Sequence, residues 1–108
     1  MNTLSTHALD ATTGSPASGL EVSLTDVDGV VLGAGRTDDD GRLTGFTDTP
    51  LPSDTYRLVF ATGDWFSARD VATFYPEVVI TFRITEGQGH FHVPLLLSPF
   101  SYSTYRGS

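Results

Sequence analysis

The segment His90-Phe91-His92-Val93-Pro94-Leu95-Leu96-Leu97 alternates between two kinds of side chain. Successive side chains of an extended strand point to opposite faces, so the segment predicts a strand whose odd-numbered residues lie in the core. The other face carries His90 and His92, which lie about 7 Å apart along the strand because each residue advances about 3.3 Å. Pro94 has no N–H to donate, so the strand is expected at a sheet edge or with its pairing interrupted there.

Several other segments alternate in the same way, and turn-forming residues separate them. Further strands are predicted over residues 4–9, 20–25, 30–36, 56–61 and 78–85. Asp28-Gly29 indicates a hairpin turn, and Asp64 is expected to cap a short helix from Trp65 to Ala72 that Pro76 prevents from continuing. About seven or eight short strands with frequent turns are typical of an antiparallel β-sandwich.

The composition excludes several classes of function. The 108 residues suit a single domain, 1–108. The net charge is −7 and every basic residue is Arg, so nucleic acid is a poor candidate partner. The absence of Cys rules out disulfides, thiolate chemistry and Cys-based zinc sites. Without an apolar run of about 18 residues or a signal peptide, we expect no membrane span and a cytoplasmic location.

Four features are candidates for chemistry: His7, Arg42, the pair His90 and His92, and the C-terminal tail 105–108. Each also has a purely structural interpretation, as exposed strand residues, as a partner for the aspartates at 38–40, or as a disordered terminus. Taken jointly they suggest a site, because neutral imidazoles relay protons to and from water. Arg42 would then hold an anionic or carbonyl-rich substrate through two parallel hydrogen bonds.

Two alternative kinds of site use the same residues. A His-x-His pair at a strand edge can bind zinc, and His7 would have to supply the third ligand that a catalytic zinc site needs. A Ser-His-Asp triad is disfavoured, because no serine lies in a Gly-x-Ser-x-Gly elbow.

Six segments together resemble the transthyretin-like 5-hydroxyisourate hydrolases, in register from Leu4 to Ser108. They are LSTHALD at 4–10, GSPASGL at 14–20, TDDDGR at 37–42, FYPEV at 74–78, HFHVPLLLSP at 90–99 and YSTYRGS at 102–108. The terminal Tyr-Arg-Gly-Ser is the most specific mark. It separates these hydrolases from true transthyretins, which carry thyroid hormone and lack this tail and the matching histidines.

The resemblance implies a fold and a reaction. The fold would be all-β, a transthyretin-like two-sheet antiparallel sandwich of about eight strands with one short helix. The protein would be a homotetramer with sites at the dimer–dimer interface, each built from two subunits. It would hydrolyse 5-hydroxyisourate to 2-oxo-4-hydroxy-4-carboxy-5-ureidoimidazoline in urate degradation, with no metal and no organic cofactor.

The resemblance also assigns residues by motif. The catalytic residues would be His7, Arg42, His92 and Ser108, and the substrate-binding residues His7, Arg42, Tyr105 and Arg106. His7 and His92 would position and deprotonate a water, and Arg42 would stabilise the oxyanion. The tail would close the pocket, and His90 would act indirectly, without taking part in the reaction itself. Phe91 stands where the family commonly has Tyr, and Asp38 where it commonly has Asn, which could shift the loop that holds Arg42. A non-catalytic carrier of a small ligand and an adhesion-type sandwich are the alternative classes.

Overall fold

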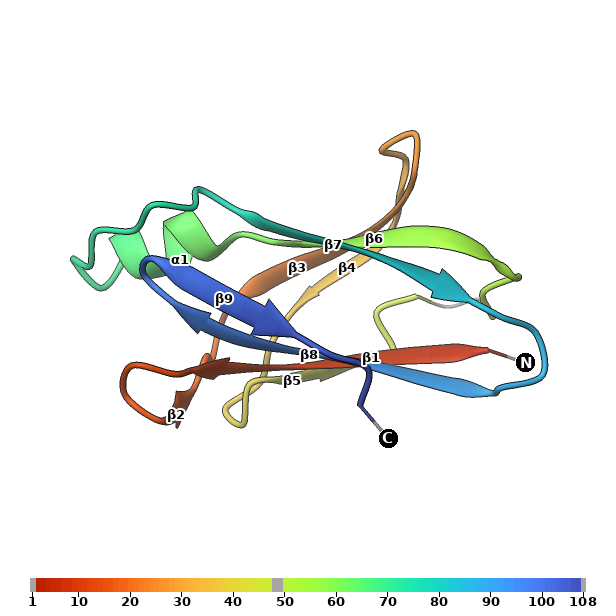
Figure 1. The fold of residues 1–108 in the computed structure, drawn as a ribbon, viewed down its shortest axis with the longest axis horizontal. Helices are drawn as coiled ribbons and strands as arrows, with labels where there is room; N and C mark the ends of the chain where they lie inside the picture. The colour runs from red at the N-terminus through yellow and green to blue at the C-terminus, as the bar shows by residue number, and fades with distance from the viewer. Residues whose placement is uncertain (1, 48–49, 108) are drawn as a thin grey trace.

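The computed structural model describes residues 2–47 and 50–107 and shows two sheets packed face to face (Figure 1). The elements are β1 Thr3–Asp10, β2 Ser15–Pro16, β3 Glu21–Asp26, β4 Val31–Arg36, β5 Arg42–Thr44, β6 Asp54–Phe60, α1 Thr62–Ser67, β7 Val78–Ile84, β8 His90–Ser98 and β9 Ser101–Thr104. One sheet has the order β2-β1-β8-β9, with β5 also paired to β1, and the other has the order β4-β3-β6-β7. The two-sheet sandwich with one short helix is therefore confirmed.

The core lies between the two sheets and is built from the alternating strand residues. On β8, Phe91, Val93, Leu95 and Leu97 expose between 0% and 7% of their surface, as the alternation predicts. The facing sheet contributes Leu24, Leu58 and Phe60, all at 0% exposure. Since fully burying one such side chain stabilises the fold by about 1.5–3 kcal/mol, these rows hold the two sheets together.

β1 and β8 pair in parallel, with Thr3 opposite His90 and Asp10 opposite Leu97. This pair is a parallel exception in a sandwich whose other strand pairs are antiparallel, as predicted. Alternation specifies which face of a strand is buried and says nothing about strand direction. Because β1 and β8 lie near opposite ends of the chain, no local hairpin sets their relative direction either.

On its β9 side the pairing of β8 is interrupted at Pro94, as the missing N–H predicts, whereas the pairing with β1 continues through Pro94 opposite His7. β9 pairs with β8 from Leu95 to Ser98, and beyond Pro94 the tail returns to β8 through a single bridge between Gly107 and His92. Residues 101–104, for which no strand was predicted, are therefore the edge strand of this sheet.

The helix is shorter than predicted and begins earlier. It spans Thr62–Ser67 without a side-chain cap, and Asp64 lies in its first turn. The Gly63 N–H donates to the carbonyl of Pro76, so a backbone contact across the loop satisfies an amide near the start of the helix. Soon after the helix ends, Asp70 adopts a left-handed conformation with φ 58°, so the chain cannot continue as a helix to Ala72.

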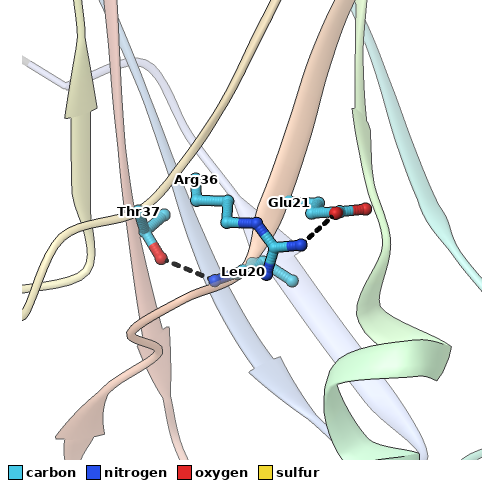
Figure 2. A network of polar contacts seen from close by, with 4 residues as sticks. All are labelled: Leu20, Glu21, Arg36 and Thr37. Carbon is cyan, nitrogen blue, oxygen red and sulfur yellow. Dashed lines mark hydrogen bonds and ion pairs between the residues drawn. The ribbon is translucent and has the colours of Figure 1, made fainter.

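The turn that precedes β5 is hydrogen-bonded to the segment just before β3 (Figure 2). The buried Thr37 hydroxyl accepts from the Leu20 amide at 2.9 Å and donates to the Ala17 carbonyl at 2.6 Å. Beside it, Arg36 forms an ion pair of 2.5 Å with Glu21. Thr37 thus fixes the start of the 38–41 loop, which leads directly into Arg42.

Among the described residues, no helix is long and apolar enough to cross a membrane.

Candidate functional site

The site residues lie on the face of the β1–β8 sheet that points away from the core. Ser5 is opposite His92 on β8 and opposite Thr44 on β5, and His7 is opposite Arg42 on β5. Directly opposite residues of a sheet share a face, so these side chains form one cluster. His7 and His92 lie on neighbouring strands, and His7 is two residues beyond Ser5, the residue opposite His92. Their Cα atoms are therefore roughly 8 Å apart.

His7 is oriented by the loop that carries Arg42. Its Nε2 lies 2.8 Å from the backbone carbonyl of Asp40. A carbonyl only accepts hydrogen bonds, so Nε2 carries the proton and Nδ1 is the acceptor of the neutral ring. The half-buried His7 ring is thereby fixed in one tautomer.

The loop itself is held by the side chain of Asp38. Its Oδ1 accepts from the backbone N–H groups of Asp40 and Arg42, both at 2.9 Å. The hydrogen bond from the Arg42 N–H is the largest influence that holds the pKa of the Asp38 carboxyl below its usual value. An Asn at this position would preserve the acceptor, since its side-chain oxygen would have the same two partners within reach.

His92 is half-buried and its pKa lies below the usual value for an imidazole. Burial is the largest cause, and Arg42, His7 and His90 add positive charge that disfavours the protonated ring. The Nδ1 of His92 is 2.7 Å from the Ser5 hydroxyl, and its Nε2 has no hydrogen-bond partner among residues 2–47 and 50–107. His92 is therefore neutral at neutral pH, with Nε2 available to a substrate or water.

His90 belongs to the same hydrogen-bonded chain. Its Nε2 lies 2.8 Å from the Ser5 hydroxyl and its Nδ1 lies 2.6 Å from the Thr3 hydroxyl. The sequence reasoning missed Thr3 and Ser5, although the period of two places them on the same face of β1 as His7. What the sequence does not give is the parallel register that brings this face beside His90 and His92.

Two cavities meet at His92. The smaller, of about 210 Å³, is lined by Ser5, Thr6, Arg42, Thr44, His90 and His92. The larger, of about 320 Å³, is lined by Ile80, Thr81, Phe82, Arg83, Phe91, His92, Val93, Thr104, Tyr105 and Arg106. The structure therefore brings His7, Arg42 and His92 together and gathers Tyr105 and Arg106 on another side of His92.

The tail crosses His92 at Gly107. The Gly107 N–H donates 2.8 Å to the His92 carbonyl, and a β-carbon at Gly107 would overlap the His92 ring. Tyr105 is exposed, and the Arg106 guanidinium lies 4.6 Å from the Phe91 ring centroid and donates to Gln88. Phe91 is in the core as predicted, yet it does contact the tail. Ser108 lies outside the described residues.

The described histidines and carboxylates do not assemble a metal site. No group of three or more His, Asp or Glu side chains in this part of the chain is placed to hold a metal ion. The three-ligand arrangement that the zinc alternative requires is thus not formed by His7, His90 and His92 here. The arrangement instead combines a neutral base, a second oriented imidazole and an exposed guanidinium, which suits hydrolysis of a polar carbonyl compound.

Comparisons with known proteins agree with this geometry. The family model described as "HIUase/Transthyretin family" matches residues 4–107. The chain is 46% identical to a 5-hydroxyisourate hydrolase of Salmonella dublin, over 99% of this chain and 82% of that protein. The solved structure of Klebsiella pneumoniae 5-hydroxyisourate hydrolase is similar with a TM-score of 0.93 and 44% identity, covering 100% of both chains. Sea bream transthyretin in complex with thyroxine is similar with a TM-score of 0.88 and 30% identity, over 96% of this chain and 93% of that one. The chain, with its sandwich and its histidine and arginine cluster, therefore belongs to the HIUase/Transthyretin family.

Proposed function

We propose that this protein is a 5-hydroxyisourate hydrolase, which opens the substrate ring with water to give 2-oxo-4-hydroxy-4-carboxy-5-ureidoimidazoline. Full-length relatives with that name, at 41–46% identity among bacterial and animal proteins, support the proposal. The single observation that carries it is the convergence of His7, His92 and Arg42 on one face of one sheet. Simple ligand binding has no need for two imidazoles prepared for proton transfer.

The geometry gives each group a role in the reaction. His92 Nε2, kept neutral by the lowered pKa of the ring, accepts a proton from the attacking water. His7 Nδ1 accepts the other hydrogen of that water and so orients it toward the ring carbonyl. Arg42 binds the carbonyl oxygen and stabilises the negative charge that develops on it. A histidine N–H then protonates the leaving nitrogen as the C–N bond breaks.

We also propose that the site is completed in a homotetramer, with Tyr105, Arg106 and Ser108 closing it at the interface between dimers. β7 and β9 are both open edges of their sheets. Exposed aromatic side chains lie on or beside β9, with Phe100 at 67%, Tyr102 at 41% and Tyr105 at 59%. Exposed apolar surface of this kind marks sites of association. Sedimentation at micromolar concentration should give about four times the mass of the 11.6 kDa chain, and a monomer at that concentration would contradict the shared site.

The alternative candidate is a transthyretin-like carrier of a small aromatic ligand. The similarity to the thyroxine complex of sea bream transthyretin favours it. A carrier would bind such a ligand without turnover, and replacing His7 or His92 would alter affinity alone.

The deciding experiment is the loss of ultraviolet absorbance of freshly prepared 5-hydroxyisourate when protein is added. Acceleration over the spontaneous decay is expected. His7→Ala and His92→Ala should each lower turnover by roughly two to four orders of magnitude, the range for a lost acid–base group, with unchanged melting curves because neither side chain is in the core. A chelator should have no effect on the rate. Wild-type protein that leaves the decay unchanged while binding thyroxine would favour the carrier.

A further inference from the structure

Four polar side chains form a continuous hydrogen-bonded chain from solvent to the catalytic histidine. In order they are Thr3, His90, Ser5 and His92, joined by contacts of 2.6, 2.8 and 2.7 Å. His90 is exposed, whereas Ser5 exposes only 6% of its surface and His92 is half-buried. The parallel pairing of β1 and β8 creates the chain, since it sets Thr3 opposite His90 and Ser5 opposite His92.

Two arrangements of the hydrogens let Ser5 link the two imidazoles. A serine hydroxyl has one proton to donate, so in each of them Ser5 donates to one imidazole and accepts from the other. In the first arrangement, His92 Nδ1–H donates to Ser5 and Ser5 donates to His90 Nε2, so His92 Nε2 is a free base. In the second, every proton is reversed, Ser5 donates to His92 Nδ1, and Nε2 of His92 carries the proton. Both arrangements keep the His92 ring neutral: in the first its Nε2 can accept a proton, and in the second its Nε2 can donate one.

We propose that Ser5 and His90 form a proton relay that lets His92 exchange protons with solvent through Nδ1 while its Nε2 faces the substrate. The proposal rests on the proposed hydrolase function. It assigns Ser5 and His90 a positioning and proton-transfer role that acts through His92.

The proton balance of the reaction closes with this relay. As water attacks the ring carbonyl, Nε2 of His92 gains a proton, Nδ1 passes one to Ser5, Ser5 passes one to His90, and His90 releases one to solvent. As the C–N bond breaks, the transfers run in reverse: Nε2 gives its proton to the leaving nitrogen and the relay draws one from solvent. The new carboxylic acid loses its own proton directly to water, and His92 is returned to its base form.

The surroundings of His92 favour this route over a doubly protonated intermediate. Burial, the largest cause, and the charge of Arg42 on β5 disfavour the imidazolium form of His92, and positive charge on His7 of β1 or His90 of β8 adds to this, while the backbone hydrogen bond with Ser5 acts the other way. A proton that arrives at Nε2 is therefore driven out at Nδ1, because the alternative places a cation next to the Arg42 guanidinium. The Ser5 hydroxyl lies 2.7 Å from Nδ1 and is the group there that can both accept a proton and pass one on, whereas the Ser5 backbone, which also hydrogen-bonds the ring, cannot relay it.

The test compares variants of the full chain at low and high concentrations of a small proton carrier, with imidazole as the probe. In Ser5→Ala the relay is cut, and we expect kcat in dilute buffer to fall by roughly tenfold to hundredfold, which is at or below the lower limit of the range for a lost acid–base group because His92 itself remains. Added imidazole should restore kcat in Ser5→Ala and leave the wild type unchanged. Ser5→Thr keeps a hydroxyl and should retain activity, and His90→Ala should show the same imidazole dependence as Ser5→Ala.

Ser98→Ala is the control for removing a strand serine that makes two hydrogen bonds, although Ser98 is less buried than Ser5. It deletes a serine that also makes two hydrogen bonds, to Ser101, at the opposite end of β8, and it should leave kcat unchanged at every imidazole concentration. A fall in kcat for Ser5→Ala that imidazole does not reverse would show that Ser5 only positions His92 and would overturn the relay, as would full activity of both Ser5→Ala and His90→Ala. If Ser5→Ala does not fold, the exposed His90→Ala variant decides alone. A wild type without hydrolase activity refutes the proposed function instead, so the two failures are distinct.

Discussion

Gly41→Ala is expected to lower both the catalytic activity and the stability of the protein. Comparison with a control glycine separates the effect of this backbone position on the site from its effect on the fold. Gly41 precedes Arg42 and has φ +77°, a left-handed conformation that costs an alanine about 1–2 kcal/mol. Its carbonyl accepts from the Ala8 N–H at 2.8 Å, so it joins the loop to β1 next to His7. A β-carbon there would collide with the carbonyl oxygen of Ala8 and lie 3.2 Å from the Ala17 amide nitrogen.

The collision sets the expected size of both effects. A carbon normally approaches a carbonyl oxygen to about 3.3 Å, so the start of β5 must move away from β1 by roughly 1 Å. Overpacking of this kind costs about 1–3 kcal/mol, which with the φ strain gives a destabilisation of roughly 2–5 kcal/mol. A displacement of about 1 Å between Arg42 and His7 is also enough to lower kcat/KM by roughly 100-fold.

Gly45→Ala is the matched control at the other end of β5. Gly45 also has a positive φ, +63°, but nothing lies within 4 Å of the position of its β-carbon. This variant should be destabilised only by the backbone strain, about 1–2 kcal/mol. The loss should appear as a fall in melting temperature of about 4–8 °C per kcal/mol. Its kcat/KM should stay within about twofold of the wild type, since β5 is not displaced.

The assay pairs thermal melting with 5-hydroxyisourate turnover, measured well below the lower melting temperature. Gly41→Ala with near wild-type kcat/KM, or equal losses of activity in both variants, would refute the argument that the loop–β1 contact sets the position of Arg42.

Three further predictions concern the tail, the pH dependence and the loop. Deleting residues 105–108 should abolish hydrolysis and leave the melting temperature nearly unchanged, because Tyr105 is exposed and β9 ends at Thr104; a large fall in melting temperature would make the tail structural. Since the pKa of His92 is lowered and the proposed base is its neutral form, kcat/KM should rise with pH through an inflection below the usual value of about 6.5 and be flat at neutral pH. An inflection above 7 would contradict the proposal that His92 is the base. Asp38→Asn should keep most activity because the Asn oxygen still accepts from the loop amides, whereas Asp38→Ala should lower kcat/KM clearly more; equal rates for the two would remove Asp38 from the support of Arg42.

The sequence predicted the parts of this structure that depend on local pattern. Alternation placed Phe91 and Leu97 in the core and both histidines of β8 outside it, and Pro94 correctly marked the interruption of pairing. The helix boundary was wrong because a backbone bond from Gly63 to Pro76, remote in sequence, replaces the expected side-chain cap. The domain limits of 1–108, the cytoplasmic location and the role of Ser108 remain predictions.

The site was less accessible from sequence, and the reason is the register of one strand pair. The motifs name His7, Arg42 and His92, but the partners that tune them are set by which residues of β1 and β8 are opposite one another. A slip of a single residue would turn the whole hydroxyl and histidine row of β1 toward the core, since side chains alternate with a period of two. The buried Leu4, Thr6 and Ala8 oppose that slip, each with 4% exposure or less. The same apolar packing that stabilises the sandwich therefore also holds Ser5 between His90 and His92, and a core substitution that loosened β1 should disturb proton transfer before it unfolds the protein.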